Sequence, residues 1–305
     1  MAGIAFFFAL RTKPRVPYPP PGPKPNLPSV PKPADPAPES PGFAKAVLKF
    51  GGEGVGAGLF KDARAVAVDG SGNIYVGEYL QRRVQVFDPS GKFVTQWTVG
   101  PQMEIQALAA DRKGNVYIQG SGTIWRFEGA TGKELGHMDY PGVAMFNDVV
   151  TTPDGGLLAS QSGIADNIVR FDAAGRTTLV IRKAVSTQSE TGELDLKVAT
   201  DGIGHIYALS SFSNAVYKFS MDGKYVSKFG SQGTQQGQFT APQAIAVDPQ
   251  GRVYVSDFNG IQVFDSEGRY LNRINSGLAL GMVINDKNEL FTAARTQIVK
   301  YAVSP

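Results

Sequence analysis

The chain repeats a long segment, and this repetition limits its fold more than any other feature. The stretch KFGGEGVGAGLFKDARAVAVDGSGNIYVGEY begins at Lys49, and KFGSQGTQQGQFTAPQAIAVDPQGRVYVSDF begins 179 residues later at Lys228. Self-similarity at a fixed period is typical of repeat folds, in which one supersecondary unit recurs and buries its surface against its neighbours.

The repeated unit occurs six times between residues 44 and 305. Each copy has an apolar run followed by an acidic turn and a second β-rich run, as in AVAVDGSGNIYV. The residues that lead this turn are Asp69, Asp111, Thr152, Asp201, Asp248 and Asn285. A later strand of each unit ends on an aromatic residue, namely Phe87, Phe127, Phe171, Phe219, Phe264 and Tyr301. The two markers agree on six units of 37 to 49 residues.

The turns within the unit predict short antiparallel strands. Asp and Asn accept backbone hydrogen bonds inside a turn, and Gly supplies a positive φ. Short strands in a repeat of 40 to 50 residues predict an all-β fold, a six-bladed β-propeller. The last unit has no room for an outermost strand after Tyr301, so we expect residues 46–50 to pair with it and close the ring. Such closure removes exposed sheet edges.

The unit resembles the NHL repeat, whose pattern is F-G-x-x-G-x-x-x-G-x-F followed by A-V-D-x-x-G-x-I-Y-V. The first copy matches at Phe50, Gly51, Gly54, Gly58, Phe60, Val68, Asp69, Gly72, Ile74, Tyr75 and Val76. The copy that begins at Lys228 matches at Phe229, Gly230, Gly233, Gly237, Phe239, Val247, Asp248, Gly251, Val253, Tyr254 and Val255. The resemblance implies the propeller fold. It leaves function open, because propellers of this family serve as RNA-binding domains, protein-interaction domains, sensors and a few enzymes.

Two segments precede the repeats. Residues 1–13 combine an apolar run with Arg11 and Lys13, a pattern that fits the end of a membrane anchor whose start lies upstream of Met1, a disordered apolar terminus or an unusual export signal. Residues 14–43 form a Pro-rich linker, with 13 prolines among the 28 residues from 14 to 41. Such a segment adopts an extended, disordered conformation and predicts a stiff spacer, or else a docking site for proline-recognising domains.

Charge and cysteine content exclude several classes of function. The chain has no Cys, which excludes a disulfide framework and a zinc ribbon. The net charge of +3 resides in residues 1–43, and residues 44–305 carry as many basic as acidic side chains. A neutral propeller argues against a nucleic-acid partner.

Candidate binding residues come from aligning the starts of the six inner strands. This alignment predicts that one mouth of the channel carries Arg64, Gln106, Asn147, Asp148, Lys197 and Gln243. These side chains can hydrogen-bond a peptide or a small polar ligand, or they can simply line a solvated channel.

A metal site is a weaker hypothesis. The segment FNDVVTTPDGG resembles the metal-site segment of the gluconolactonase and senescence-marker propellers, which implies Asn147 as a ligand. Its aligned neighbours Arg64, Leu196 and Gln243 add no carboxylate, so we expect no metal and no other cofactor. His137 and His205 lie outside the alignment, and the Gly-rich segments GGEGVGAG and GSQGTQQG precede no helix that a phosphate site would use.

Exposed loops supply a second candidate surface. It consists of Tyr79, Arg82, Arg83, Phe212 and Phe258, which either form an interaction surface or pack between blades. The sequence therefore predicts a non-catalytic binding, scaffold or sensor propeller for protein, peptide or envelope carbohydrate, tethered to a membrane on the extracytoplasmic side. The alternatives are a metal-dependent hydrolase or lyase of the gluconolactonase type, and an RNA-binding propeller.

Overall fold

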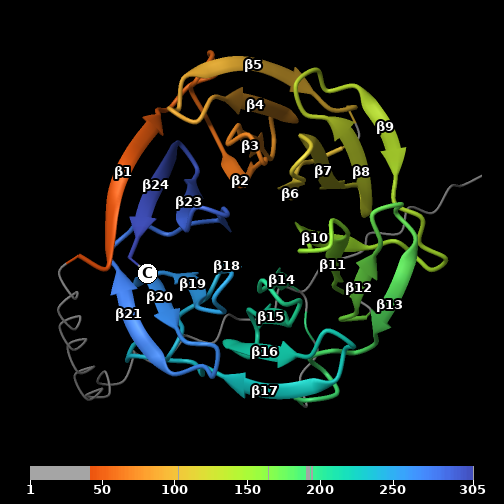
Figure 1. The fold of residues 1–305 in the computed structure, drawn as a ribbon, viewed down its shortest axis with the longest axis vertical. Helices are drawn as coiled ribbons and strands as arrows, with labels where there is room; N and C mark the ends of the chain where they lie inside the picture. The colour runs from red at the N-terminus through yellow and green to blue at the C-terminus, as the bar shows by residue number, and fades with distance from the viewer. Residues whose placement is uncertain (1–41, 102, 164, 190–192, 194, 305) are drawn as a thin grey trace, which may run out of the picture. The chain divides into compact units, whose positions relative to one another are not determined.

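The computed structural model describes residues 42–304, apart from 102, 164, 190–192 and 194. These residues form six four-stranded antiparallel sheets arranged as blades around a central channel (Figure 1). The fold is the all-β six-bladed propeller that the repeats predict. The expected anchor and most of the Pro-rich linker lie outside the described residues. No helix in the described part of the chain is long and apolar enough to cross a membrane.

Each blade is built from consecutive strands, except for the last. Blades 1 to 3 contain β2 (Ala63–Val68), β3 (Ile74–Glu78), β4 (Arg83–Phe87), β5 (Phe93–Thr98), β6 (Ala107–Ala110), β7 (Asn115–Gly120), β8 (Thr123–Glu128), β9 (Glu134–His137), β10 (Phe146–Thr151), β11 (Leu157–Gln161), β12 (Ile168–Phe171) and β13 (Thr177–Ile181). Blades 4 to 6 contain β14 (Leu196–Thr200), β15 (Ile206–Ser210), β16 (Ala215–Phe219), β17 (Tyr225–Phe229), β18 (Ala244–Val247), β19 (Val253–Asp257), β20 (Gly260–Phe264), β21 (Tyr270–Ile274), β22 (Gly281–Ile284), β23 (Glu289–Ala294), β24 (Gln297–Val303) and β1 (Ala44–Gly51).

The outermost strand of blade 6 comes from the other end of the propeller sequence. β1 pairs antiparallel with β24, from Ala44 opposite Val303 to Gly51 opposite Gln297. Two further bonds extend this seam, because Ser304 donates its N–H to the carbonyl of Phe43 and its hydroxyl to the carbonyl of Gly42. Arg252 of blade 5 also donates to the carbonyl of Ser304. Residues 46–50 thus pair with the last blade as the length of the final repeat predicts.

The repeated Asp–Gly turns are held by one recurring hydrogen-bond pattern. In the first repeat, Asp69 accepts the N–H groups of Ser71 and Asn73 at 2.9 Å, and the hydroxyl of Tyr75 donates to its other oxygen over 2.9 Å. Asp111, Asp201 and Asp248 do the same in their blades. The motif therefore holds the turn between the first two strands of a blade. The bonds also satisfy a carboxylate that would be costly to bury without partners.

The Gly-rich crossings between blades fold closely around aromatic side chains. Phe60 and Phe239 are fully buried and pack on Phe87 and Phe264, with ring centroids 5.8 and 5.6 Å apart. A Cβ on Gly230 would lie 2.4 Å from the Phe239 ring, and φ there is +88°. Only Gly combines this positive φ with the absence of a Cβ, so the close packing of the crossing explains why Gly is used there.

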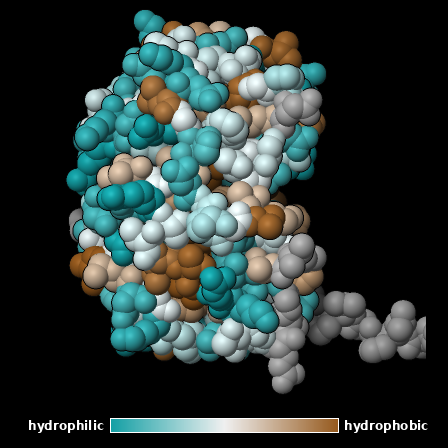
Figure 2. Space-filling model, turned by 90° about the vertical axis from the view of Figure 1, so that its right-hand side faces the viewer, coloured by the Kyte–Doolittle hydropathy of each residue, from teal (hydrophilic) through white to brown (hydrophobic). Residues whose placement is uncertain are grey.

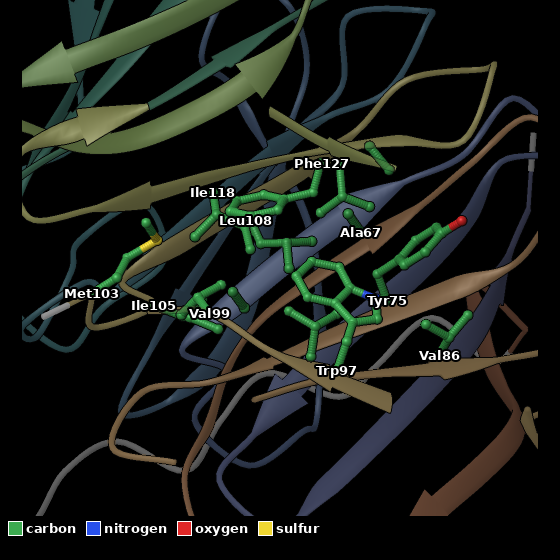
Figure 3. Close-up of a cluster of buried hydrophobic side chains, with 14 residues drawn as sticks. Ala67, Tyr75, Val86, Trp97, Val99, Met103, Ile105, Leu108, Ile118 and Phe127 are labelled. Carbon is green, nitrogen blue, oxygen red and sulfur yellow. The ribbon is translucent and has the colours of Figure 1, made fainter. Parts of the chain in front are cut away.

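The apolar core consists of clusters between neighbouring blades. The cluster between blades 1 and 2, drawn in Figure 3, contains Trp97 and Phe127 with ring centroids 5.3 Å apart. The indole N–H of Trp97 also donates to the carbonyl of Gly129 over 2.8 Å. On the outer side of the ring that carries β9 and β13, hydrophobic residues form small groups among hydrophilic ones (Figure 2). The buried apolar surface therefore lies mainly where one blade meets the next.

The two faces of the ring differ in which loops they carry. We call the face where the inner strands begin the start face, and the opposite face, which carries the Asp–Gly turns, the turn face. The second strand of each blade runs from the turn face to the start face. The turns between second and third strands therefore also lie on the start face. Hydrogen bonds confirm this, because Tyr79 donates its N–H to the carbonyl of Asp62 and Gln106 donates to that of Gln119.

Candidate functional site

The predicted mouth residues lie at or beside the first residues of the inner strands. Arg64 belongs to β2, Asn147 and Asp148 to β10, and Lys197 to β14. Gln106 and Gln243 lie one residue before β6 and β18. The structure therefore places these residues at the start-face ends of their inner strands.

A hydrogen-bonded polar group joins blades 3 and 4 on this face. Asn147 donates its amide N–H groups to Asp195 and to the carbonyl of Leu196, each over 3.2 Å. The hydroxyl of Ser160 donates to the carbonyl of Leu196 and lies 3.1 Å from the amide oxygen of Asn147. The ammonium of Lys197 lies 3.1 Å from the carboxylate of Asp195. The sequence alignment missed Asp195 and Ser160, although Asp195 lies directly before β14 and two residues before Lys197.

Asp148 connects the same two blades through the backbone. Its carboxylate accepts the N–H of Val198 over 2.8 Å, which satisfies a donor on the channel edge of β14. Burial raises the pKa of Asp148 to about 6, although Lys197 and the Val198 N–H oppose the shift. Burial alone would lower the pKa of Lys197, but the carboxylates of Asp148 and Asp195 outweigh it and raise that pKa. Lys197 is therefore a fixed cation at neutral pH.

Blades 1 and 2 hold a second polar group. The guanidinium of Arg64 lies 4.2 Å from the centre of the Tyr79 ring and 2.8 Å from the carboxylate of Asp62. A side-chain hydrogen bond with Glu104 raises the pKa of Tyr79. The positive charge of Arg64 slightly opposes the rise in the pKa of Lys197. Gln106 is exposed, and Gln243 donates to the carbonyl of Ala241, so the predicted set divides into separate groups.

The donor set around Asn147 does not fit a metal ion. The carboxylate that Asn147 contacts is Asp195, and the ammonium of Lys197 pairs with it. A hard cation needs several converging oxygen ligands, and a fixed ammonium repels it. Within the described residues no group of three or more His, Cys, Asp and Glu side chains is arranged to hold a metal. His205 instead bonds Asp201 in its turn, and His137 packs against Trp125.

The predicted interaction loops need one correction. Phe212 and Phe258 are 58% and 66% exposed on the start face, and Tyr79 is half-buried under Arg64. Arg83 is buried, so its assignment to an exposed loop is wrong. The Gly-rich crossing folds over Arg83, which donates to the carbonyls of Val55 and Leu59, and its guanidinium pairs with buried Glu78.

A cavity of about 760 Å³ occupies the other end of the channel. It is lined by the later halves of the inner strands and by first turns on the turn face, and none of the six predicted mouth residues borders it. Two of the carboxylates that line it form ion pairs, since Asp286 lies 3.0 Å from Arg112 and Asp154 lies 2.8 Å from Arg170. The cavity and the start-face polar groups are therefore separate features.

Sequence comparison identifies relatives, one of which is named for the NHL repeat. The chain is 27% identical over 219 residues to human NHL repeat-containing protein 3, which covers 69% of this chain and 54% of the relative. It is 52% identical over 48 residues to the B-box type zinc finger protein ncl-1 of Caenorhabditis elegans, which covers 15% of this chain. The chain spans about half of the first relative and 6% of the second. No family model matches the chain.

Solved structures with the same architecture include enzymes. A putative gluconolactonase superposes with a TM-score of 0.65 at 13% identity, covering 86% of this chain and 92% of the other. A streptogramin B lyase superposes with a TM-score of 0.59 at 12% identity, covering 86% and 98%. At these identities the likeness establishes the fold alone.

Proposed function

Since the chain is an NHL-type propeller with a fold similar to that of gluconolactonases, we propose that it is a non-catalytic binding domain whose ligand lies on the start face. The observation that carries the proposal is the distribution of exposed apolar side chains. Large apolar residues that are exposed on the start-face loops are Val55, Leu59, Leu80, Val143, Met145, Phe212 and Phe258. On the turn-face loops the corresponding residues are Ile203 and Met221. Exposed apolar side chains concentrated on one face favour a binding role for that face.

The chemistry of the start face favours binding over catalysis. A catalytic acid or base must reach the substrate with an available proton or lone pair. Asp148 uses one carboxylate oxygen to accept the Val198 N–H, and Asp195 pairs with Lys197. These contacts hold blades 3 and 4 together, so we assign these carboxylates a structural role.

The remainder of the proposal concerns location. We propose that residues 1–13 anchor the chain to a membrane and that residues 14–43 hold the propeller away from it on the extracytoplasmic side. The support is the apolar run, its basic flank and the proline content of the sequence.

Thermal unfolding in the presence of metal ions tests the non-catalytic proposal against the hydrolase alternative. The melting temperature is measured with EDTA and then with calcium, zinc, manganese or magnesium, and hydrolysis of gluconolactone is assayed in parallel. A bound ion at 100 times its Kd would stabilise the fold by ~2.7 kcal/mol. We expect no such shift and no hydrolysis. A shift that Asn147→Ala removes, accompanied by turnover, would overturn the proposal.

A further inference from the structure

The start face of blades 4, 5 and 6 contains a continuous surface without formal charge. It consists of residues 211–214, 230–243, 258–259 and 275–280, which we call the uncharged arc. Hydrogen bonds join its segments, because Ser211 donates its hydroxyl to the carbonyl of Pro242 and Phe258 donates its N–H to that of Thr240. Ala279 bonds the hydroxyl of Ser256 in blade 5 and so attaches the last segment. The arc is therefore one surface, although its parts are distant in sequence.

The charge-free character distinguishes this arc from the rest of the same face. Outside the arc the start face is charged, with Lys61, Arg64, Glu104 and Lys183 in blades 1 to 3, Asp195 and Lys197 at the start of blade 4, and Arg295 in a turn of blade 6. Beside the arc, Asp257 is fully buried and accepts the N–H groups of Thr240 and Asn259. Its carboxylate consequently does not face a ligand.

Two exposed phenylalanines stand on the arc in adjacent blades. Phe212 and Phe258 both lie in the turn between the second and third strands of their blades. They are 58% and 66% exposed, which is unusual for side chains of this size. An aromatic ring offers a flat apolar face that packs against another flat apolar surface.

The arc also exposes amide and hydroxyl groups. Gln232, Gln235 and Gln236 are exposed in the crossing between blades 4 and 5, and Thr234 is exposed among them. Ser213 and Asn259 lie beside the two phenylalanines in sequence. Amides supply a donor and an acceptor at one site, as the hydroxyl groups of a polyol require.

We infer that the uncharged arc binds a neutral oligosaccharide or polysaccharide, an inference that rests on the proposed binding function of the start face. The C–H face of a pyranose ring is flat and apolar and stacks on phenylalanine, while its equatorial hydroxyls bond amides. A neutral sugar brings no charge that would lose its hydration without a partner. Protein interfaces instead use Trp, Tyr and Arg as energetic centres with charged rims, and the arc contains none of these residue types.

Calorimetric titration of the full chain tests this inference. The probes are neutral hexasaccharides of glucose, mannose, galactose and N-acetylglucosamine, with an acidic hexagalacturonate for comparison. We expect at least one neutral probe to bind and the acidic probe to bind more weakly. The double variant Phe212→Ser, Phe258→Ser should weaken binding by about tenfold or more, because both stacking faces are lost.

A matched control removes exposed apolar side chains from the turn face of the ring. Ile203→Ser with Met221→Ser changes residues that are 73% and 53% exposed in blade 4, and it should leave sugar affinity unchanged. Failure of every neutral probe to bind, or binding that the Phe212 and Phe258 changes do not weaken, would overturn the inference. A pool of dodecapeptides is titrated alongside. Peptide binding that depends on the two phenylalanines would identify a peptide as the ligand in place of a sugar, and the proposed binding function of the start face would still hold.

Discussion

The hydroxyl of Tyr254 donates a hydrogen bond to the carboxylate of Asp248 over 3.3 Å, at a site where Asp248 is fully buried. Asp248 also accepts the N–H groups of Gln250 and Arg252 and pairs with the Arg252 side chain. The same pair recurs as Tyr75 with Asp69 and as Tyr207 with Asp201. Burial and the neighbouring carboxylate raise the pKa of each of these tyrosines.

Removing one buried turn carboxylate should destabilise the propeller strongly. Asp248→Ala leaves two N–H groups, a phenol and the Arg252 side chain without their acceptor, so we expect a loss of about 3 kcal/mol in the free energy of unfolding. Asp265 is a matched control, since it accepts the N–H groups of Glu267 and Arg269 in a turn where its side chain is 21% exposed. Asp265→Ala should cost about 1 kcal/mol or less by urea denaturation, because water replaces the lost bonds. Equal losses would contradict the structural role of the buried pair.

The closing strand β1 should contribute as much as a strand within one blade. Phe50 on β1 packs on Phe87 with ring centroids 4.6 Å apart, and Phe229 on β17 packs on Phe264 at 5.0 Å. Both phenylalanines are half-buried, so Phe50→Ala and Phe229→Ala should each cost about 2 to 4 kcal/mol in denaturant unfolding. A silent Phe50→Ala beside a costly Phe229→Ala would mean that β1 does not hold the ring closed.

Asp148 should make stability fall as the pH rises through its titration. Burial raises its pKa from the ordinary 3.8 to about 6, so the folded chain binds this proton more tightly than the unfolded chain does. Its contribution is therefore most favourable below about pH 4 and is lost as the pH rises through about 6. Melting temperatures from pH 4 to 8 should show this decline, and Asp148→Asn should remove it. Asp139→Asn, which changes an exposed carboxylate in the crossing between blades 2 and 3, should leave the decline in place. If the decline persists in Asp148→Asn, another group causes it.

Substitution of two adjacent arginines in blade 1 should change the free energy of unfolding by very different amounts. Arg83→Met leaves the fully buried carboxylate of Glu78 without its partner, and we expect a cost of about 3 to 5 kcal/mol. Arg82→Ala alters the neighbouring, more accessible side chain and should change stability by about 0.5 kcal/mol or less. Differential scanning calorimetry of the two variants checks this, and comparable costs would remove the distinction between them.

The blades were predictable because their signals are local. An Asp, a Gly three residues later and a Tyr six residues after the Asp specify one turn and the strand that follows it, whatever the rest of the chain does. The starts of the inner strands follow from the same spacing, so Arg64, Asn147 and Lys197 lie where the alignment places them. The closing role of residues 46–50 followed from strand counting.

The side-chain partners were less predictable because they depend on contacts between blades. Asp195 reaches Asn147 from the crossing between blades 3 and 4, and no motif spans that distance. The sequence around Arg83 suggests an exposed loop, but in the structure the Gly-rich crossing covers this residue. The four segments of the uncharged arc are visible in the sequence, but only the ring brings them onto one surface.

Blocking one face at a time tests most directly whether the start face binds the ligand. The chain has no native Cys, so Phe212→Cys and Met221→Cys each create a single site for a bulky maleimide-polyethylene glycol. Each conjugate is immobilised and exposed to extract from the cells that make the protein, and the carbohydrate and protein retained are quantified against the unmodified chain. We expect retention to be lost when the start face is blocked at residue 212 and to be unchanged when the turn face is blocked at residue 221. Retention that survives the block at 212 and disappears with the block at 221 would contradict this expectation.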